Sequence, residues 1–207
     1  MSKRSDIHDR VLNASSLRDI EDAYRDWAGD YDRELVEGSG YVAPRQCATT
    51  LRELLPDTGA AVLDAGCGTG LVGHYLAEAG VQTIDGLDYS KDMLDVAATK
   101  GCYRELMQAD LNGPLDIESN RYDATVCVGT FTTGHVGPAA LFELIRVTSE
   151  NGPLCFTVRD SFWQESQFTR VIDEAARRGM AEVVSSTEVP YIEKEGSTCH
   201  QVVMRVA

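Results

Sequence analysis

The sequence of 207 residues has no apolar stretch approaching the roughly 20 residues needed to cross a bilayer. Its first residues, Met-Ser-Lys-Arg-Ser-Asp-Ile-His, lack the apolar core of a secretory signal peptide. The six cysteines form no Cys-x-x-Cys pair, and His8, His74 and His200 show no metal-ligand spacing. We therefore expect a cytoplasmic protein with no membrane span and no bound metal.

Basic residues are also scarce. The chain has 19 Lys and Arg against 33 Asp and Glu, a net charge of −14. Affinity for nucleic acid comes largely from Lys and Arg that neutralise phosphates, so the balance argues against RNA, DNA or acidic membranes as the main partner. A local basic patch can still hide in such a sum. The length suits one α/β domain with short additions.

The most informative segment lies at residues 61–70 and reads Ala-Val-Leu-Asp-Ala-Gly-Cys-Gly-Thr-Gly. Three apolar residues predict the first strand of a parallel sheet. Gly66, Gly68 and Gly70 then predict a loop whose backbone turns sharply and lets a ligand lie against it. A loop of this kind, closing a strand and opening a helix, is where open α/β sheets bind nucleotide-like ligands.

Strand and helix patterns alternate after this loop, which predicts a mainly parallel sheet. Two strand-like runs end the chain around a turn at 193–196, which predicts an antiparallel hairpin. The expected strands are 61–63, 83–87, 103–108, 124–128, 154–158, 182–191 and 198–206, and the expected helices are 44–55, 71–79, a helix capped by Ser90, 138–147 and 168–178.

The amino-terminal segment predicts a helix that precedes this core. Leu17, Ile20, Tyr24, Trp27 and Tyr31 are spaced three and four residues apart, so they share one helical face. We expect residues 1–57 to be an amino-terminal helical region and residues 58–207 the ligand-binding core, within one structural domain.

Three aspartates narrow the choice of ligand. Residues 68–73 match the dinucleotide pattern GxGxxG, with Asp88 downstream, but a lone match is weak. Asp64 at the strand end would repel a pyrophosphate and attract a cation. Asp88 can accept hydrogen bonds from ribose hydroxyls, and Asp110 from the exocyclic amine of adenine. Together they describe adenosine joined to an amino acid.

Several motifs carry a resemblance. Residues 62–70, Gly-Leu-Asp-Tyr-Ser at 86–90, Ala-Asp-Leu at 109–111 and Tyr-Asp-Ala-Thr-Val-Cys-Val-Gly at 122–129 resemble the ordered motifs of class I S-adenosylmethionine (SAM) methyltransferases. Segments 24–32, 41–45 and 128–136 resemble the Williams–Beuren-region methyltransferase-like proteins and their bacterial relatives. The resemblance implies a Rossmann-like seven-stranded sheet with helices on both faces and an antiparallel final strand. It also implies SAM as cofactor and S-adenosylhomocysteine (SAH) as product.

The resemblance and the residues together define a set expected to bind the cofactor. The resemblance implies that residues 1–57 form a helical cap over the cofactor site and that its aromatic residues cover the methionine end, although these residues can equally pack the helix onto the sheet. The set is Tyr24, Trp27, Tyr31, Asp64, Gly66, Cys67, Gly68, Gly70, Asp88, Tyr89, Met93, Asp110, Leu111 and Val128.

Methyl transfer from a sulfonium is an in-line displacement with a neutral leaving group, so it needs no acid. His135 is the candidate general base, with an exposed loop histidine as the alternative. Thr130, His135 and Arg159 are candidate contacts to a small-molecule acceptor, although Arg159 can instead form a salt bridge. Two other functions stay open: a SAM- or SAH-binding protein without transferase activity, and a nicotinamide-dependent oxidoreductase.

Overall fold

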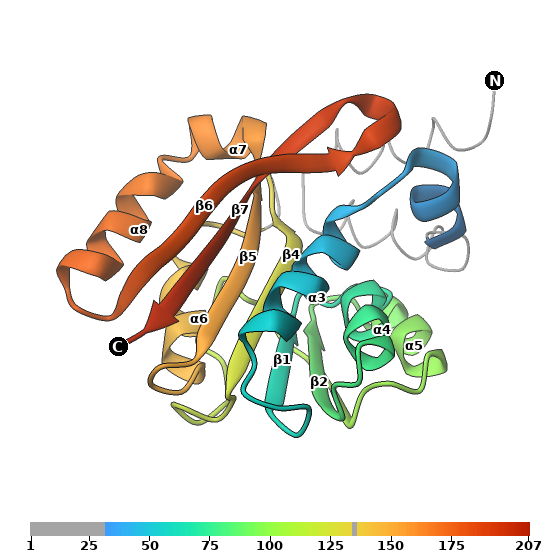
Figure 1. Cartoon of the computed structure of the whole chain (residues 1–207), viewed down its shortest axis with the longest axis horizontal. Coiled ribbons are helices and arrows are strands. Elements are labelled where there is room, and N and C mark those ends of the chain that lie inside the picture. The colour runs from blue at the N-terminus through green and yellow to red at the C-terminus, as the bar shows by residue number, and fades with distance from the viewer. Residues whose placement is uncertain (1–31, 134–135) are drawn as a thin grey trace.

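The computed structural model describes residues 32–133 and 136–207 (Figure 1). Seven strands form one sheet in the order β3-β2-β1-β4-β5-β7-β6, which confirms the predicted fold class. All neighbours pair in parallel except β5 with β7 and β6 with β7, which are antiparallel. The strands are β1 (Ala61–Ala65), β2 (Thr83–Asp88), β3 (Glu105–Gln108), β4 (Ala124–Phe131), β5 (Pro153–Arg159), β6 (Ala181–Ile192) and β7 (Ser197–Val206).

Helices cover both faces of this sheet (Figure 1). Buried residues of α3 and α4 join one apolar cluster with Val62 and Ile84, whereas those of α6 and α8 join a second cluster with Leu63 and Phe156. Because successive strand residues point to opposite faces, β1 contributes to both clusters. The helical segments are η1 (Arg33–Ser39), α3 (Ala43–Leu54), α4 (Leu71–Glu78), α5 (Lys91–Thr99), α6 (Ala140–Val147), α7 (Asp160–Glu165), α8 (Phe168–Arg177) and the 3-10 turn η2 (Glu193–Glu195).

The strand order places a ligand crevice in the middle of the sheet. Consecutive strands run outward from β1 to β2 and β3, and then from β4 to β5 on the other side of β1. Ligands of open α/β sheets bind outside the carboxyl ends of the strands at such a reversal. The glycine loop follows β1 directly, so it lies at this point.

Two local predictions differ from the structure. The strand predicted at 103–108 begins at Glu105, because Tyr103 turns its ring beneath the glycine loop. The six-residue helix α7 was not predicted, since so short a segment shows too little periodicity. In the described ranges, no helix is both long and apolar enough to span a bilayer.

Candidate active site

The glycine loop is fixed to the end of the neighbouring strand. The backbone N–H groups of Gly66 and Cys67 both donate to the carbonyl of Leu87, at 2.7 and 2.9 Å. Gly66 has φ +72°, and a Cβ there would lie 2.2 Å from Oγ1 of Thr130. Glycine is therefore required at this position, both for its backbone conformation and for the close approach of β4.

Asp88 stands at the end of β2 and faces the loop. Its Oδ2 accepts the N–H of Gly68 at 2.8 Å, and its Oδ1 accepts the N–H of Ser90 at 2.9 Å. Burial raises the pKa of this carboxyl, although the backbone hydrogen bonds oppose the shift. Ser90 caps α5 as predicted, since its hydroxyl accepts the N–H of Met93 at 3.3 Å.

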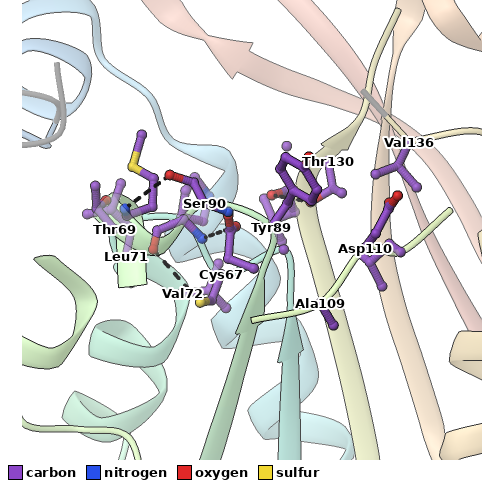
Figure 2. Close-up of a pocket in the computed structure, with 18 of the residues that line it drawn as sticks. Cys67, Thr69, Leu71, Val72, Tyr89, Ser90, Ala109, Asp110, Thr130 and Val136 are labelled. Carbon is purple, nitrogen blue, oxygen red and sulfur yellow. Dashed lines mark hydrogen bonds between the residues drawn. The ribbon is translucent and has the colours of Figure 1, made fainter. Parts of the chain in front are cut away.

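A cavity opens above these groups (Figure 2). Its walls come from the loops after β1 to β4 and from the start of α3, so residues far apart in the sequence meet there. The lining residues are Tyr41, Pro44, Gly66, Cys67, Gly68, Thr69, Leu71, Val72, Asp88, Tyr89, Ser90, Met93, Ala109, Asp110, Leu111, Asn112, Val128, Gly129, Thr130 and Val136.

Asp110 follows β3 and lies on the opposite side of the cavity from Thr69 (Figure 2). Its Oδ1 accepts the backbone N–H of Asn112 at 2.8 Å and the side-chain amide of Asn112 at 3.1 Å. These bonds orient the carboxylate and leave Oδ2 without a donor among the described residues. The side chain is therefore held in place with one oxygen available to a ligand.

Asp64 lies at the end of β1 and is fully buried. Its Oδ2 accepts the N–H of Gly73 at 3.1 Å and the hydroxyl of Tyr103 at 2.6 Å. Its Oδ1 is buried and accepts no hydrogen bond from the described residues. Burial raises the pKa of Asp64 from 3.8 to about 7, while the two hydrogen bonds oppose this rise and the nearby Asp88 adds to it.

Gly73, which completes the GxGxxG match, serves packing in this structure. A Cβ on residue 73 would lie 2.3 Å from the ring and hydroxyl of Tyr103. Gly70 and Gly86 also leave room for that ring, since a Cβ there would lie 2.9 and 3.0 Å from it. The third glycine of the pattern therefore makes space for the tyrosine that hydrogen-bonds Asp64.

The structure brings most of the predicted site residues together. Ten of them line the cavity: Gly66, Cys67, Gly68, Asp88, Tyr89, Met93, Asp110, Leu111, Val128 and Thr130. Asp64 and Gly70 lie beside the loop without being among the lining residues, and the guanidinium of Arg159 lies 5.8 Å from the ring centre of Tyr191. Tyr24, Trp27, Tyr31 and His135 lie outside the described residues.

Sequence reasoning missed the wall that α3 provides. Tyr41 and Pro44 line the cavity, and the hydroxyl of Tyr41 donates to that of Tyr191 at 3.3 Å, in the terminal hairpin. The expected cap at 1–57 and the resemblance of segment 41–45 both included this region, but nothing in its spacing singles out a ligand contact. Thr69 was also missed; its hydroxyl donates to Asp32 at 2.5 Å.

The fold and this site define a SAM-dependent methyltransferase of class I, and comparisons with known proteins agree. Residues 62–152 match the family described as "Methyltransferase domain". Human methyltransferase-like protein 27 is 31% identical over 201 residues, which cover 93% of this chain and 81% of the human protein. The chain belongs to this family of methyltransferases, whose cofactor is SAM and which transfer its methyl group to an acceptor.

Further matches are consistent with this family assignment. A malonyl-[acyl-carrier protein] O-methyltransferase of Pectobacterium atrosepticum is 32% identical over 165 residues, covering 76% of this chain and 60% of that protein. Among solved structures, a TehB-like SAM-dependent methyltransferase from Corynebacterium glutamicum superposes with a TM-score of 0.68 at 22% identity, covering 90% of this chain and all of the other. The structural likeness concerns the fold.

Proposed function

We propose that the cavity binds SAM across the ends of β1, β2 and β3, and that the enzyme methylates a small molecule by in-line displacement. The observation that carries the binding site is Asp88. Each of its oxygens accepts one backbone N–H, so each keeps a lone pair, and the residue lines the cavity. A carboxylate held in this way suits the two adjacent hydroxyls of a ribose.

The remaining groups fit the rest of the cofactor. The free oxygen of Asp110 suits the amine of adenine, and Met93, Leu111 and Val128 offer apolar surface to the base. The buried Oδ1 of Asp64 needs a donor, which the ammonium group of the methionine part supplies through a water molecule. Burial raises the pKa of Cys67, so its thiol is an uncharged part of the wall.

When bound, SAM supplies a methyl group attached to its sulfonium, and the rest of the molecule leaves as neutral SAH. The chain must therefore orient the acceptor and exclude water rather than provide an acid. Thr130 lines the cavity beside Gly66, where its hydroxyl can orient an acceptor. We keep His135 as the candidate base for an acceptor that must lose a proton, and Arg159 as a candidate contact to an acidic acceptor.

We also propose that residues 1–57 form a cap over the cofactor, with 58–207 as the core. Two described contacts support this. Asp32 accepts the hydroxyl of Thr69 in the glycine loop and pairs with Lys100, which follows α5. Tyr41 and Pro44 add a wall to the cavity from the same amino-terminal region. Tyr24, Trp27 and Tyr31 are the proposed aromatic cover.

A compact acceptor is favoured over a nucleic acid. The cavity wall comes from short loops, strand ends and the first turns of α3, α4 and α5, and the net charge of −14 opposes binding to a polyanion. A bovine 18S rRNA (guanine-N(7))-methyltransferase is similar over only 67 residues, or 32% of this chain. That match covers only 24% of the bovine protein.

Calorimetry with SAM and SAH tests the binding site. Asp88→Ala removes the acceptor for two ribose hydroxyls, and hydrogen bonds to charged groups contribute about 1.5–3 kcal/mol each, so we expect affinity to fall at least 100-fold. Asp95→Ala, at an exposed aspartate of the following helix, is the matched control. Equal binding by Asp88→Ala and wild type would refute the site.

Activity needs a separate measurement. SAH release across a panel of small acceptors, with total RNA as a comparison, distinguishes a small-molecule enzyme from an RNA methyltransferase. If no acceptor in the panel leads to SAH release while SAH binds tightly, the result would favour a binding protein without transferase activity. Tight binding of NAD without binding of SAM would instead support the oxidoreductase.

A further inference from the structure

A second group of chemically active side chains lies away from the cavity, at the junction of β5, β6 and β7. Asp160, Glu188 and His200 each place one oxygen or nitrogen atom within 4.8 Å of the others. Nε2 of His200 lies 3.5 Å from Oδ1 of Asp160. None of the three lines the cavity, so the proposed methyl-transfer site does not account for them.

The strand register explains why they meet. Glu188 of β6 pairs with His200 of β7, and directly paired residues of antiparallel strands share a face. Val158 of β5 pairs with His200 on its other side. Asp160 begins α7 directly after β5 ends at Arg159, and this position brings its carboxylate to His200. Spacing alone predicts no ligand set, because positions 160, 188 and 200 come together only in the folded sheet.

The imidazole is held rigidly in this group. The ring of Trp163 in α7 stacks on His200, with ring centres 4.1 Å apart and planes 11° from parallel. Stacking restricts the rotation of the imidazole and keeps Nε2 directed at the carboxylates. Glu188 is exposed and the other two are partly exposed, so the group is open to solvent.

The group also carries an uncompensated charge. Two carboxylates face one imidazole, and within the described residues no Lys or Arg forms an ion pair with either carboxylate. The 3.5 Å separation matches the distance of about 3.3–3.6 Å between ligand atoms in a tetrahedral site with 2.0–2.2 Å bonds. One imidazole and two carboxylates are ligands suited to zinc, with water as the fourth ligand.

We infer that Asp160, Glu188 and His200 form a binding site for one divalent transition-metal ion of the zinc type. The ion would neutralise the two carboxylates. It would join the end of β5 to the terminal hairpin, next to Arg159 and at the start of α7. Its role there is structural, since the ligands lie outside the cavity that we assign to methyl transfer.

Zn²⁺ titration of the metal-stripped full chain without a polyhistidine tag tests this site. Calorimetry should show one Zn²⁺ per chain that raises the melting temperature and changes the fluorescence of Trp163, while Mg²⁺ should not compete at equal concentration. Glu188→Gln alters an exposed side chain and should weaken Zn²⁺ binding at least about tenfold, as should His200→Gln. Circular dichroism checks that both variants fold.

A matched pair elsewhere provides the control. Nε2 of His74 lies 3.4 Å from Oε1 of Glu78 on α4, but the described part of the chain places no third ligand beside them. Glu78→Gln should therefore bind Zn²⁺ like wild type. The site is refuted if wild type does not bind Zn²⁺ at micromolar concentration, if Glu188→Gln binds as tightly as wild type, or if Glu78→Gln causes the same loss.

Discussion

Two fully buried aspartates on neighbouring strands differ in how their charge is satisfied. Asp85 of β2 is contacted by Nε of Arg104 at 2.9 Å, by a second guanidinium nitrogen of Arg104 and by the hydroxyl of Tyr122 at 3.0 Å. Among residues 32–133 and 136–207, Asp64 of β1 accepts only from the Gly73 N–H and the Tyr103 hydroxyl, both on one oxygen. The two side chains lie on opposite faces of the sheet, one step apart in register.

The comparison distinguishes a carboxylate that stabilises the fold from one that we propose takes part in ligand binding. A buried carboxylate with an arginine and a hydroxyl needs nothing further, and it fixes the loop before β3 to the sheet. A buried carboxylate with an unpartnered oxygen is destabilising unless a ligand or water supplies a donor. We therefore propose that Asp64 serves cofactor binding from beside the cavity, whereas Asp85 is part of the framework.

The largest effect is expected from Arg104→Ala. Removing the arginine leaves Asp85 buried without a countercharge, so we expect the free energy of unfolding to fall by about 3 kcal/mol. Chemical denaturation measures this loss, and SAM affinity of the folded variant should stay within about twofold of wild type. A stability loss below about 1 kcal/mol, or a tenfold change in affinity, would contradict the structural assignment of Asp85.

Asp64→Asn should instead weaken SAM binding without lowering the stability of the fold. The variant loses the charge that faces the ligand ammonium, so calorimetry should show SAM binding about tenfold weaker, which corresponds to about 1.4 kcal/mol. The free energy of unfolding should not decrease, because the amide oxygen can still accept from Gly73 and Tyr103 and the buried charge is removed. Asp85→Asn is the matched control and should lose stability while it keeps its affinity.

The pH dependence of binding should be smaller but diagnostic. The folded pKa of Asp64 is raised to about 7, so the carboxyl is mostly protonated at pH 6 and increasingly ionised above it. SAM binding should therefore tighten about fivefold between about pH 6 and 7.2, below the range in which an α-amino group loses its proton. Asp64→Asn should show a flatter profile; an equal slope in both proteins would assign the dependence to Asp88.

The same shift has a consequence for stability. Because the pKa is raised on folding, the native state holds more protons than the unfolded state between about pH 4 and 7. The contribution of Asp64 to the free energy of unfolding therefore decreases as the pH rises through this window. This decrease should disappear in Asp64→Asn.

The smallest effect is expected from a third aspartate. Asp32 connects the amino-terminal segment to Thr69 and Lys100, and both contacts are partly solvated. Asp32→Asn should weaken SAM binding by about threefold or less, since partly exposed ion pairs contribute at most about 1 kcal/mol. Calorimetry measures the change, and a loss larger than that of Asp64→Asn would show that the cap contributes more than the sheet edge.

Much of the fold could be predicted from the sequence, because its signals are local. The apolar run before Asp64, the capping Ser90 and the terminal hairpin each depend on a few adjacent residues, and all three are present. The positions of Asp88 and Asp110 could be predicted in the same way, because each lies just after the end of a predicted strand. The strand order confirms that these ends share one edge.

The remaining features depend on contacts between distant segments. Tyr103 looked like the first residue of a strand, since nothing near it shows that its hydroxyl reaches Asp64, 39 positions away. Tyr41 lines the cavity and contacts Tyr191 and Ile192 of the terminal hairpin, which spacing within its own segment cannot reveal. The group at Asp160, Glu188 and His200 requires the register of β6 with β7 and the position of α7 after β5.

Because the ring of Tyr103 lies against residue 73, the substitutions that these two distant positions tolerate depend on each other. An alanine at 73 would improve the intrinsic stability of α4 by about 1 kcal/mol, but its methyl group would collide with the ring. Only a smaller residue at 103 would leave room for this methyl group, and the hydroxyl that lowers the pKa of Asp64 would then be lost. In related chains, alanine at 73 should therefore accompany the absence of tyrosine at 103, and such a pair would move cofactor binding to a higher pH.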